Sequence, residues 1–181
     1  MEQTTDYCYN CDATKSLQLS SSYPNALLSI SLLVSNNIDS SSKLVVHNCF
    51  ENANSEVVLD MDMIENEVAL SNALPPKSSM DMAFSVKNKE GVSRIVLSEL
   101  KLNVDNVFNV KMADIDKKCT STMGYFSENQ IFENVFVIFA DNRVEVAKSN
   151  FSRWRIAHNY NPNRKAITMI ELQKMFFLYR V

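Results

Sequence analysis

The segment that most constrains the fold of this chain is residues 131–140. Its sequence, IFENVFVIFA, is almost continuously apolar. Such a run is typical of a strand inside a sheet whose two faces are both covered by other elements. The length of 181 residues is suited to about one domain. The segment therefore predicts a buried strand with packed layers on both sides.

A β-hairpin is expected upstream of this strand. Residues 80–86 and 92–103 are rich in apolar and β-branched side chains. The turn-type residues 88–91 (Asn-Lys-Glu-Gly) separate them, as in strands joined by a short turn. Gly91 is one of only two glycines in the chain, and we expect it to set the register of the two strands.

The remaining elements alternate between helical and extended patterns. Residues 26–34 fit a helical stripe and also fit strand alternation. The elements expected elsewhere are strands over 43–50, 56–63 and 166–170, helices over 105–124 and after 141–142, a segment 172–179, and an unassigned segment 65–74. Asp105 is the expected N-cap of the first helix, with Phe108 and Ile115 on its buried face. This order predicts a mixed α/β domain over residues 51–181, with residues 1–50 as a small N-terminal extension.

The scarcity of glycine excludes several classes of enzyme. An average protein of this length would contain roughly 13 glycines, but this chain has only Gly91 and Gly124. The phosphate-binding loops of nucleotide-binding proteins and the nucleophile elbow of hydrolases need glycines at fixed spacings. Any chemistry must therefore depend on carboxylates, amines, thiols or a metal ion.

The net charge of −3 conceals an asymmetry along the chain. Residues 1–86 contain eleven acidic and three basic side chains, and residues 143–181 contain two acidic and eight basic ones. The basic end interleaves cations with an aromatic residue, a combination that can neutralise phosphates and stack on bases. The candidate nucleic-acid-binding residues are Arg153, Trp154, Arg155, Arg164 and Lys165. A solvated helix face with one core tryptophan is the alternative interpretation.

Two carboxylates and an amine form the candidate catalytic group. Residues two apart on a strand share a face, so Glu99 and Lys101 lie side by side within an apolar strand, and the paired strand offers Asp81. Buried charges need a partner or a metal ion, and converging carboxylates repel unless a cation lies between them. Mg²⁺ or Mn²⁺ held by Asp81 and Glu99, with Lys101 at the attacking water, would suffice for phosphodiester hydrolysis.

The motif around these residues resembles the PD-(D/E)XK, or restriction-endonuclease-like, nuclease superfamily. The resemblance is carried by Ser79-Met80-Asp81 and by the segment RIVLSELK that contains Glu99 and Lys101, over roughly residues 56–140. It implies a core of helix, three strands, helix and strand. It also implies a Mg²⁺-dependent endonuclease in which Asp81 and Glu99 hold the metal and Lys101 acts at water. Membership of a bacterial defence or mobile-element system is a further implication.

The chain departs from the family pattern at two points. Met80 stands where proline often precedes the acid, and the extra acid on the first helix has only loose candidates, namely Asp60, Asp62, Glu65 and Glu67. Two alternatives stay open: a Glu–Lys pair on an exposed strand face, and an inactive subunit that keeps the fold for docking or nucleic-acid binding. The apolar segment 175–179 could face a protein partner or a second copy, or could complete the core.

Cysteine spacing suggests a separate zinc site. Cys8 and Cys11 have the C-x₂-C spacing of a zinc hook, and His47 and Cys49 lie two residues apart. Together they could form a Cys₃His structural site. Free thiols, with Cys49 in a core, are the alternative.

The ends of the chain and its apolar runs indicate a cytoplasmic protein. The N-terminus lacks the basic and apolar stretches of a secretory signal. The longest early apolar run is far shorter than the roughly 20 residues of a membrane span. Four cysteines are consistent with reduced thiols in the cytosol. We therefore expect nucleic acid, and DNA first, as the partner, and no membrane association.

Overall fold

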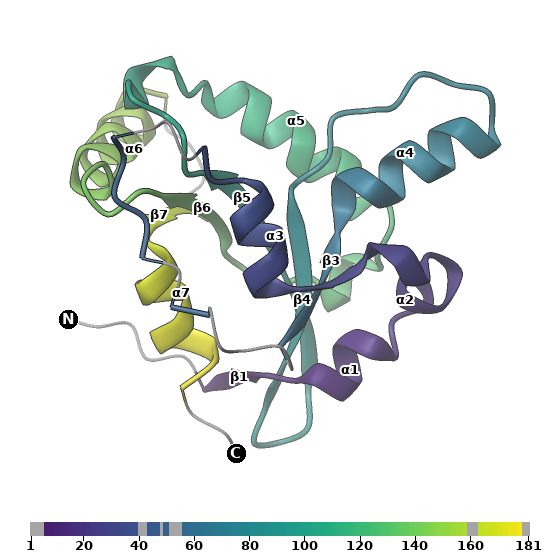
Figure 1. The fold of residues 1–181 in the computed structure, drawn as a ribbon. Helices are drawn as coiled ribbons and strands as arrows, with labels where there is room; N and C mark the ends of the chain where they lie inside the picture. The colour runs from purple at the N-terminus through teal and green to yellow at the C-terminus, as the bar shows by residue number, and fades with distance from the viewer. Residues whose placement is uncertain (1–5, 40–42, 48, 51–55, 159–162, 179–181) are drawn as a thin grey trace.

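The computed structural model describes residues 6–39, 43–47, 49–50, 56–158 and 163–178. Within these residues, seven strands form one sheet in the order β2-β3-β4-β5-β6-β7, and β1 pairs with the far end of β4 (Figure 1). The strands are β1 (Tyr7–Tyr9), β2 (Leu27–Ser29), β3 (Val57–Asp60), β4 (Met82–Asn88), β5 (Ser93–Lys101), β6 (Val135–Phe139) and β7 (Arg164–Ile167). The first five are joined by antiparallel pairs, and β6 and β7 run parallel to β5. The mixed α/β fold is thus confirmed.

Helices precede and follow these strands in an alternating order. The α-helices are α1 (Cys11–Lys15), α2 (Gln18–Ser22), α3 (Ile30–Asn36), α4 (Met61–Ser71), α5 (Met112–Met123), α6 (Val144–His158) and α7 (Met169–Phe176). The 3₁₀ turns are η1 (Pro24–Ala26), η2 (Val107–Asn109) and η3 (Glu128–Gln130). In the described residues no helix is both long and apolar enough to cross a membrane.

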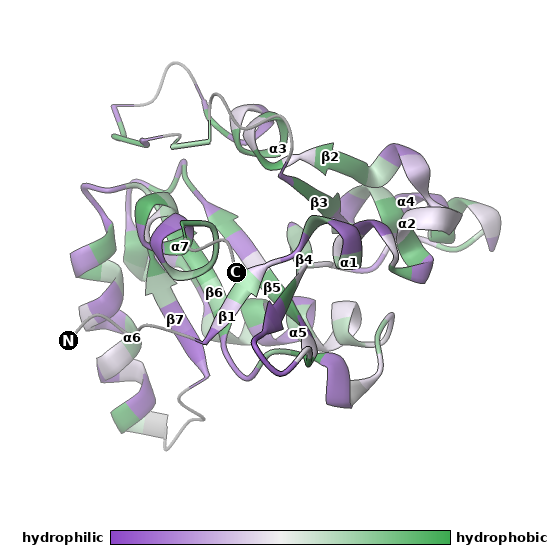
Figure 2. Ribbon diagram, turned by 90° about the horizontal axis from the view of Figure 1, so that it is seen from below, coloured by the Kyte–Doolittle hydropathy of each residue, from purple (hydrophilic) through white to green (hydrophobic). Residues whose placement is uncertain are grey.

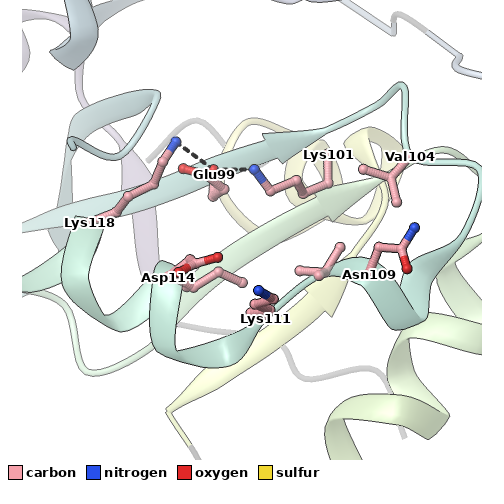
Figure 3. Close-up of a pocket in the computed structure, with 9 residues that line it drawn as sticks. Glu99, Lys101, Val104, Asn109, Lys111, Asp114 and Lys118 are labelled. Carbon is pink, nitrogen blue, oxygen red and sulfur yellow. Dashed lines mark hydrogen bonds and ion pairs between the residues drawn. The ribbon is translucent and has the colours of Figure 1, made fainter.

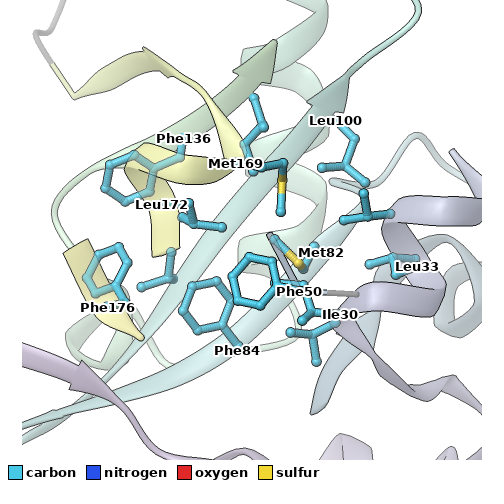
Figure 4. Close-up of a cluster of buried hydrophobic side chains, with 14 of the residues drawn as sticks. Ile30, Leu33, Phe50, Met82, Phe84, Leu100, Phe136, Met169, Leu172 and Phe176 are labelled. Atoms are coloured by element: carbon cyan, nitrogen blue, oxygen red, sulfur yellow. The ribbon is translucent and has the colours of Figure 1, made fainter. Parts of the chain in front are cut away.

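Strand β6 lies between β5 and β7 and is covered on both faces, as its apolar sequence predicts. All five of its residues are buried. Phe136 and Ile138 pack with α3 and α7 on one face, whereas Val137 and Phe139 pack with α5 and α6 on the other. Figure 4 shows the first of these layers, and Figure 2 shows the strands at the sheet centre mainly in the green of hydrophobic residues. Two apolar layers therefore hold the sheet between them.

The hairpin of β4 and β5 is also confirmed, with Met82 opposite Ser98 and Val86 opposite Arg94. Gly91 has φ +84° in the connecting turn. Side chains other than glycine rarely adopt this left-handed backbone. An added Cβ would meet only the Lys87 side chain at an ordinary 3.6 Å, so the backbone conformation rather than space explains glycine here.

The expected strand over 43–50 is wrong in its described part. Residues 43–47 form no strand; instead they bond to the loop after β6. Val45 accepts from the amide of Asp141 at 2.7 Å, and its own amide donates to Asn142 Oδ1 at 3.3 Å. The His47 amide likewise donates to Asp141 Oδ2 at 3.0 Å, so these backbone groups are paired without a neighbouring strand.

The starts of the three helices α4, α3 and α5 also differ from the sequence prediction. The strand expected over 56–63 ends at Asp60, whose carboxylate caps α4 by accepting from Met63 N at 2.9 Å. Residues 26–34 contain both candidate elements, β2 and then α3. Asp105 is not the cap of α5, which begins at Met112, and Phe108 lies exposed on η2 rather than on a buried face.

The N-terminal residues are built into the same sheet as the rest of the chain. β1 lies beside the end of β4, and the Tyr9 hydroxyl donates to Val57 O at 2.8 Å and accepts from Val57 N at 2.7 Å. At the other end of the chain, Phe176 is buried and Phe177 stacks on Tyr9 with ring centroids 4.5 Å apart. In its described part, the apolar C-terminal segment therefore completes the core.

Candidate functional site

Asp81 and Glu99 meet where β4 begins beside β5. Ala83 pairs with Leu97 and Met82 with Ser98, so the same register places Asp81 opposite Glu99. The Asp81 carboxylate accepts a hydrogen bond from the Leu100 amide at 2.6 Å. The side chain of Glu99 is fully buried. The predicted pair of carboxylates is therefore brought together inside the domain.

Two lysines approach the same carboxylate oxygen of Glu99. Lys101 Nζ lies 2.5 Å and Lys118 Nζ 2.7 Å from Glu99 Oε1 (Figure 3). Lys118 also lies 3.4 Å from Asp81 Oδ1. Lys101 comes from β5 itself. Lys118 comes from α5, the helix that follows β5 and precedes β6 in the chain. The site thus contains two carboxylates and two ammonium groups.

The second oxygen of Glu99 has no partner. Among the described residues, Glu99 Oε2 is buried and receives no hydrogen bond. An unsatisfied buried carboxylate oxygen is costly, and in native proteins it calls for an explanation such as an ion or a water molecule. The chemistry of two converging carboxylates with a free oxygen fits a hard cation such as Mg²⁺ or Mn²⁺. In the described residues no group of three or more His, Cys, Asp or Glu is placed to hold a metal, so the candidate set is this pair.

The electrostatics of the site follow from its burial. Burial raises the pKa of Asp81 to about 6, with a further increase from Glu99, while Lys118 and the Leu100 amide oppose the rise. Burial alone would lower the pKa of Lys118, but Asp81 and Glu99 outweigh it and raise that pKa. Perturbed groups that interact in this way are characteristic of functional sites.

The segment before Asp81 is held by polar contacts from α4 and α5. The Met80 amide donates to Thr122 Oγ1 at 2.8 Å, and the Ser79 hydroxyl donates to Asp62. Glu65 accepts from the Lys77 amide at 2.7 Å and from the Tyr125 hydroxyl at 2.5 Å. Of the loose acid candidates, Asp62 therefore lies near Asp81, and its charge acts on the pKa of Asp81. Glu65 instead anchors the loop.

A pocket opens beside the charged group. It has a volume of about 220 Å³ and lies between the end of β5, η2 and the first turns of α5 (Figure 3). Its polar lining residues are Glu99, Lys101, Asn109, Lys111, Asp114 and Lys118. Three lysines against two carboxylates make this pocket suited to an anionic group next to the buried pair.

The raised pKa of Asp81 predicts a pH dependence of stability. Between about pH 4 and about pH 6, folded Asp81 keeps a proton that the unfolded chain has lost. The folded state then binds more protons than the unfolded state, so the free energy of unfolding falls as the pH rises through this window. Above about pH 6, Asp81 causes no further change in the free energy of unfolding. We expect urea unfolding in EDTA to show this fall for wild type relative to Asp81→Asn. Parallel profiles from pH 4 to 8 would contradict the assignment.

The basic residues of the C-terminal region do not form one surface. Arg153 and Arg155 are exposed on α6, and Trp154 packs partly against the core between α5 and α6. Arg164 is paired with Asp116 of α5 at 3.1 Å. Lys165 follows it on β7, so these two side chains point to opposite faces of the sheet. The arrangement leaves Arg153 and Arg155 as the solvent-facing cations among the five candidates.

The four candidate zinc ligands have other partners or lie apart from one another. His47 Nδ1 is 2.5 Å from Asp141 Oδ2, and Cys49 donates to Met169 O at 3.5 Å. Burial raises the pKa of the Cys49 thiol to about 11, which disfavours the thiolate that zinc requires. Cys8 lies on β1 and Cys11 begins α1, and neither they nor Cys49 form a disulfide. Zinc at these residues stays a prediction.

Sequence reasoning missed Lys118, Lys111 and the pocket. A signal for Lys118 existed, because it lies three residues after the buried Ile115 and one before the buried Cys119. A lysine at the margin of a buried helix face reaches toward whatever that face covers. The residues around Lys118 do not, however, indicate which strand the helix α5 packs against.

No protein-family model, no curated protein and no solved structure matches this chain.

Proposed function

We propose that this protein is a metal-dependent nuclease that hydrolyses phosphodiester bonds in nucleic acid. The observation that carries the proposal is the convergence of Asp81 and Glu99 with Lys101 and Lys118, beside a pocket lined by lysines. The free oxygen of Glu99 supports it, because a buried carboxylate oxygen without a partner fits a bound cation. The raised pKa of Asp81 also supports it, because perturbed carboxyl groups are characteristic of functional sites.

The order of elements also supports the proposal. The succession α3, β3, β4, β5, α5 and β6, with three antiparallel strands followed by a parallel one, is similar to the PD-(D/E)XK core. Helix α4 would be an insertion between the first two strands of that core. Asp81, directly before the second strand, and Glu99–Lys101 on the third would then correspond to the acids and the lysine of the family motif.

Asp81 and Glu99 would hold Mg²⁺ or Mn²⁺ through their carboxylates. Such an ion, when bound, polarises a phosphoryl oxygen and makes water a stronger nucleophile at neutral pH. Lys101 is the residue that orients the attacking water, and Lys118 places a second positive charge beside the phosphate. In hydrolysis the water oxygen bonds to phosphorus, the ester P–O bond breaks, and the water proton ends on the leaving oxygen.

A second candidate function is an inactive subunit that docks onto nucleic acid or a larger complex. The specific observation in its favour is Lys118, whose ammonium group lies where two carboxylates would otherwise need a cation. Two acids and two lysines are already balanced in charge. A buried cluster of this kind can serve structure alone.

The direct test is cleavage of single-stranded and double-stranded DNA and RNA by the purified protein. We expect cleavage with millimolar Mg²⁺ or Mn²⁺ and none in EDTA. Absence of cleavage of every substrate with either ion, from protein shown to be folded by circular dichroism, would favour the inactive subunit.

A further inference from the structure

An exposed aromatic residue directly precedes three residues that line the pocket. Phe108 is the central residue of η2 and is 62% exposed. Its neighbour Val107 is 2% exposed and packs with Phe139 and Phe151 in the core, and Val110 packs against the same cluster. The ring therefore projects outward from a turn whose flanking residues are fixed.

Hydrogen bonds hold this turn in place. Asn106 Oδ1 accepts from the Phe108 amide at 3.1 Å, and the Val110 amide donates to Val107 O at 3.0 Å. Leaving a large apolar ring in water, on a turn that is otherwise well anchored, gains nothing for folding. What sets Phe108 apart is its place, because the turn that carries it continues into Asn109, Val110 and Lys111 of the pocket.

The residues that follow Phe108 line the pocket. Asn109, Val110 and Lys111 form its wall, with Lys101 and Lys118 across from them (Figure 3). Among the described residues Lys111 has no ion-pair partner. At about 220 Å³ the pocket is smaller than the roughly 300–1,000 Å³ that whole small-molecule ligands occupy. The pocket can hold a phosphate group of a nucleotide. The base of the same nucleotide would then lie outside the pocket.

We infer that Phe108 stacks on an unpaired base of a single-stranded nucleic acid whose backbone phosphate enters the lysine-lined pocket. An aromatic platform next to a basic channel is the arrangement by which proteins bind single strands. Bases in a duplex are already stacked on each other and do not present a free face. This inference rests on the proposed function for the identity of the pocket as the reaction site, and it names the substrate class.

The test measures binding rather than cleavage. Fluorescence anisotropy in EDTA compares a short oligothymidine with a duplex of the same length. Phe108→Ala is expected to weaken binding of the single strand about 5- to 150-fold, the range of one base–aromatic stack, and to change duplex binding less than twofold. Phe108→Trp should keep the affinity. Lys111→Ala should reduce the salt slope by about 0.7, the value for one phosphate contact on a single strand.

Leu70→Ala is the matched control, because Leu70 is 83% exposed on α4 and lies outside the pocket lining. Single-strand affinity that is unchanged in Phe108→Ala, an equal loss for the duplex, or no single-strand binding by wild type would each overturn the inference. Single-strand binding that depends on Phe108, without cleavage in Mg²⁺ or Mn²⁺, would contradict the nuclease proposal alone. Cleavage indifferent to Phe108 would contradict this inference alone.

Discussion

Lys101→Ala is expected to lower the rate of Mg²⁺-dependent cleavage by about 10²–10⁴-fold. This is the usual loss when a group that handles a proton or orients water is removed. Asp81→Asn should lower the rate at least as far, because it removes a carboxylate charge from the candidate cation pair while preserving the acceptor for the Leu100 amide. The measurement is single-turnover cleavage of a labelled oligonucleotide at saturating metal.

Lys87→Ala is a matched control for this experiment. Lys87 is an exposed lysine on β4, away from the site residues. Isothermal titration calorimetry separates the two site variants, because Asp81→Asn should lose Mg²⁺ affinity and Lys101→Ala should retain it. Cleavage unaffected by both substitutions would remove Asp81 and Lys101 from the site.

Lys118→Ala is expected to reduce the free energy of unfolding in EDTA by about 3 kcal/mol. Removing one partner of a buried ion pair leaves an uncompensated charge, at a cost of about 3–5 kcal/mol. The lower end applies because Lys101 still contacts Glu99 and because the Lys118 side chain is 24% exposed. In millimolar Mg²⁺ we expect most of this loss to be recovered, since an ion that binds only the folded state stabilises it. Urea unfolding with and without Mg²⁺ measures both quantities.

The recovery distinguishes the two proposed functions. If the cluster serves structure alone, Lys118→Ala should be destabilised equally with and without Mg²⁺. Lys117→Ala, at the exposed neighbouring position of α5, controls for helix propensity and net charge. Equal stability of the two variants in EDTA would contradict the role assigned to Lys118 in the cluster.

Local patterns in the sequence predicted the centre of the sheet well. The apolar run of β6 predicted a buried strand. The two-residue alternation in the first strand of the hairpin placed Met80, Phe84 and Val86 on one apolar face, and Phe84 and Val86 do share a core cluster. Met80 fails this pattern and packs on the other face. Its amide is bound by Thr122 of α5, so β4 begins two residues later than the alternation suggests.

Patterns were weaker where a segment's partner lies far away in the chain. Residues 43–47 have strand-like composition, but the loop after β6 supplies their hydrogen-bond partners. Arg164 belongs to a basic stretch, yet Asp116 of α5 holds its guanidinium. The contact partner lies about 100 residues away in the first case and about 50 in the second. Such distant contacts override the local propensity and cannot be predicted from local sequence patterns.

The sequence by itself determined that Glu99 and Lys101 share one face of a buried strand and that Asp81 lies beside them in the hairpin, directly before the paired strand β4. That follows from the two-residue period of a strand and from a four-residue turn, which are both local properties. Only the tertiary structure decided that Lys118 joins them, that a lysine-lined pocket opens there and that Phe108 faces outward. These features depend on where α5 and η2 cross the sheet, and the packing of Val107, Met112 and Ile115 against β6 sets that position.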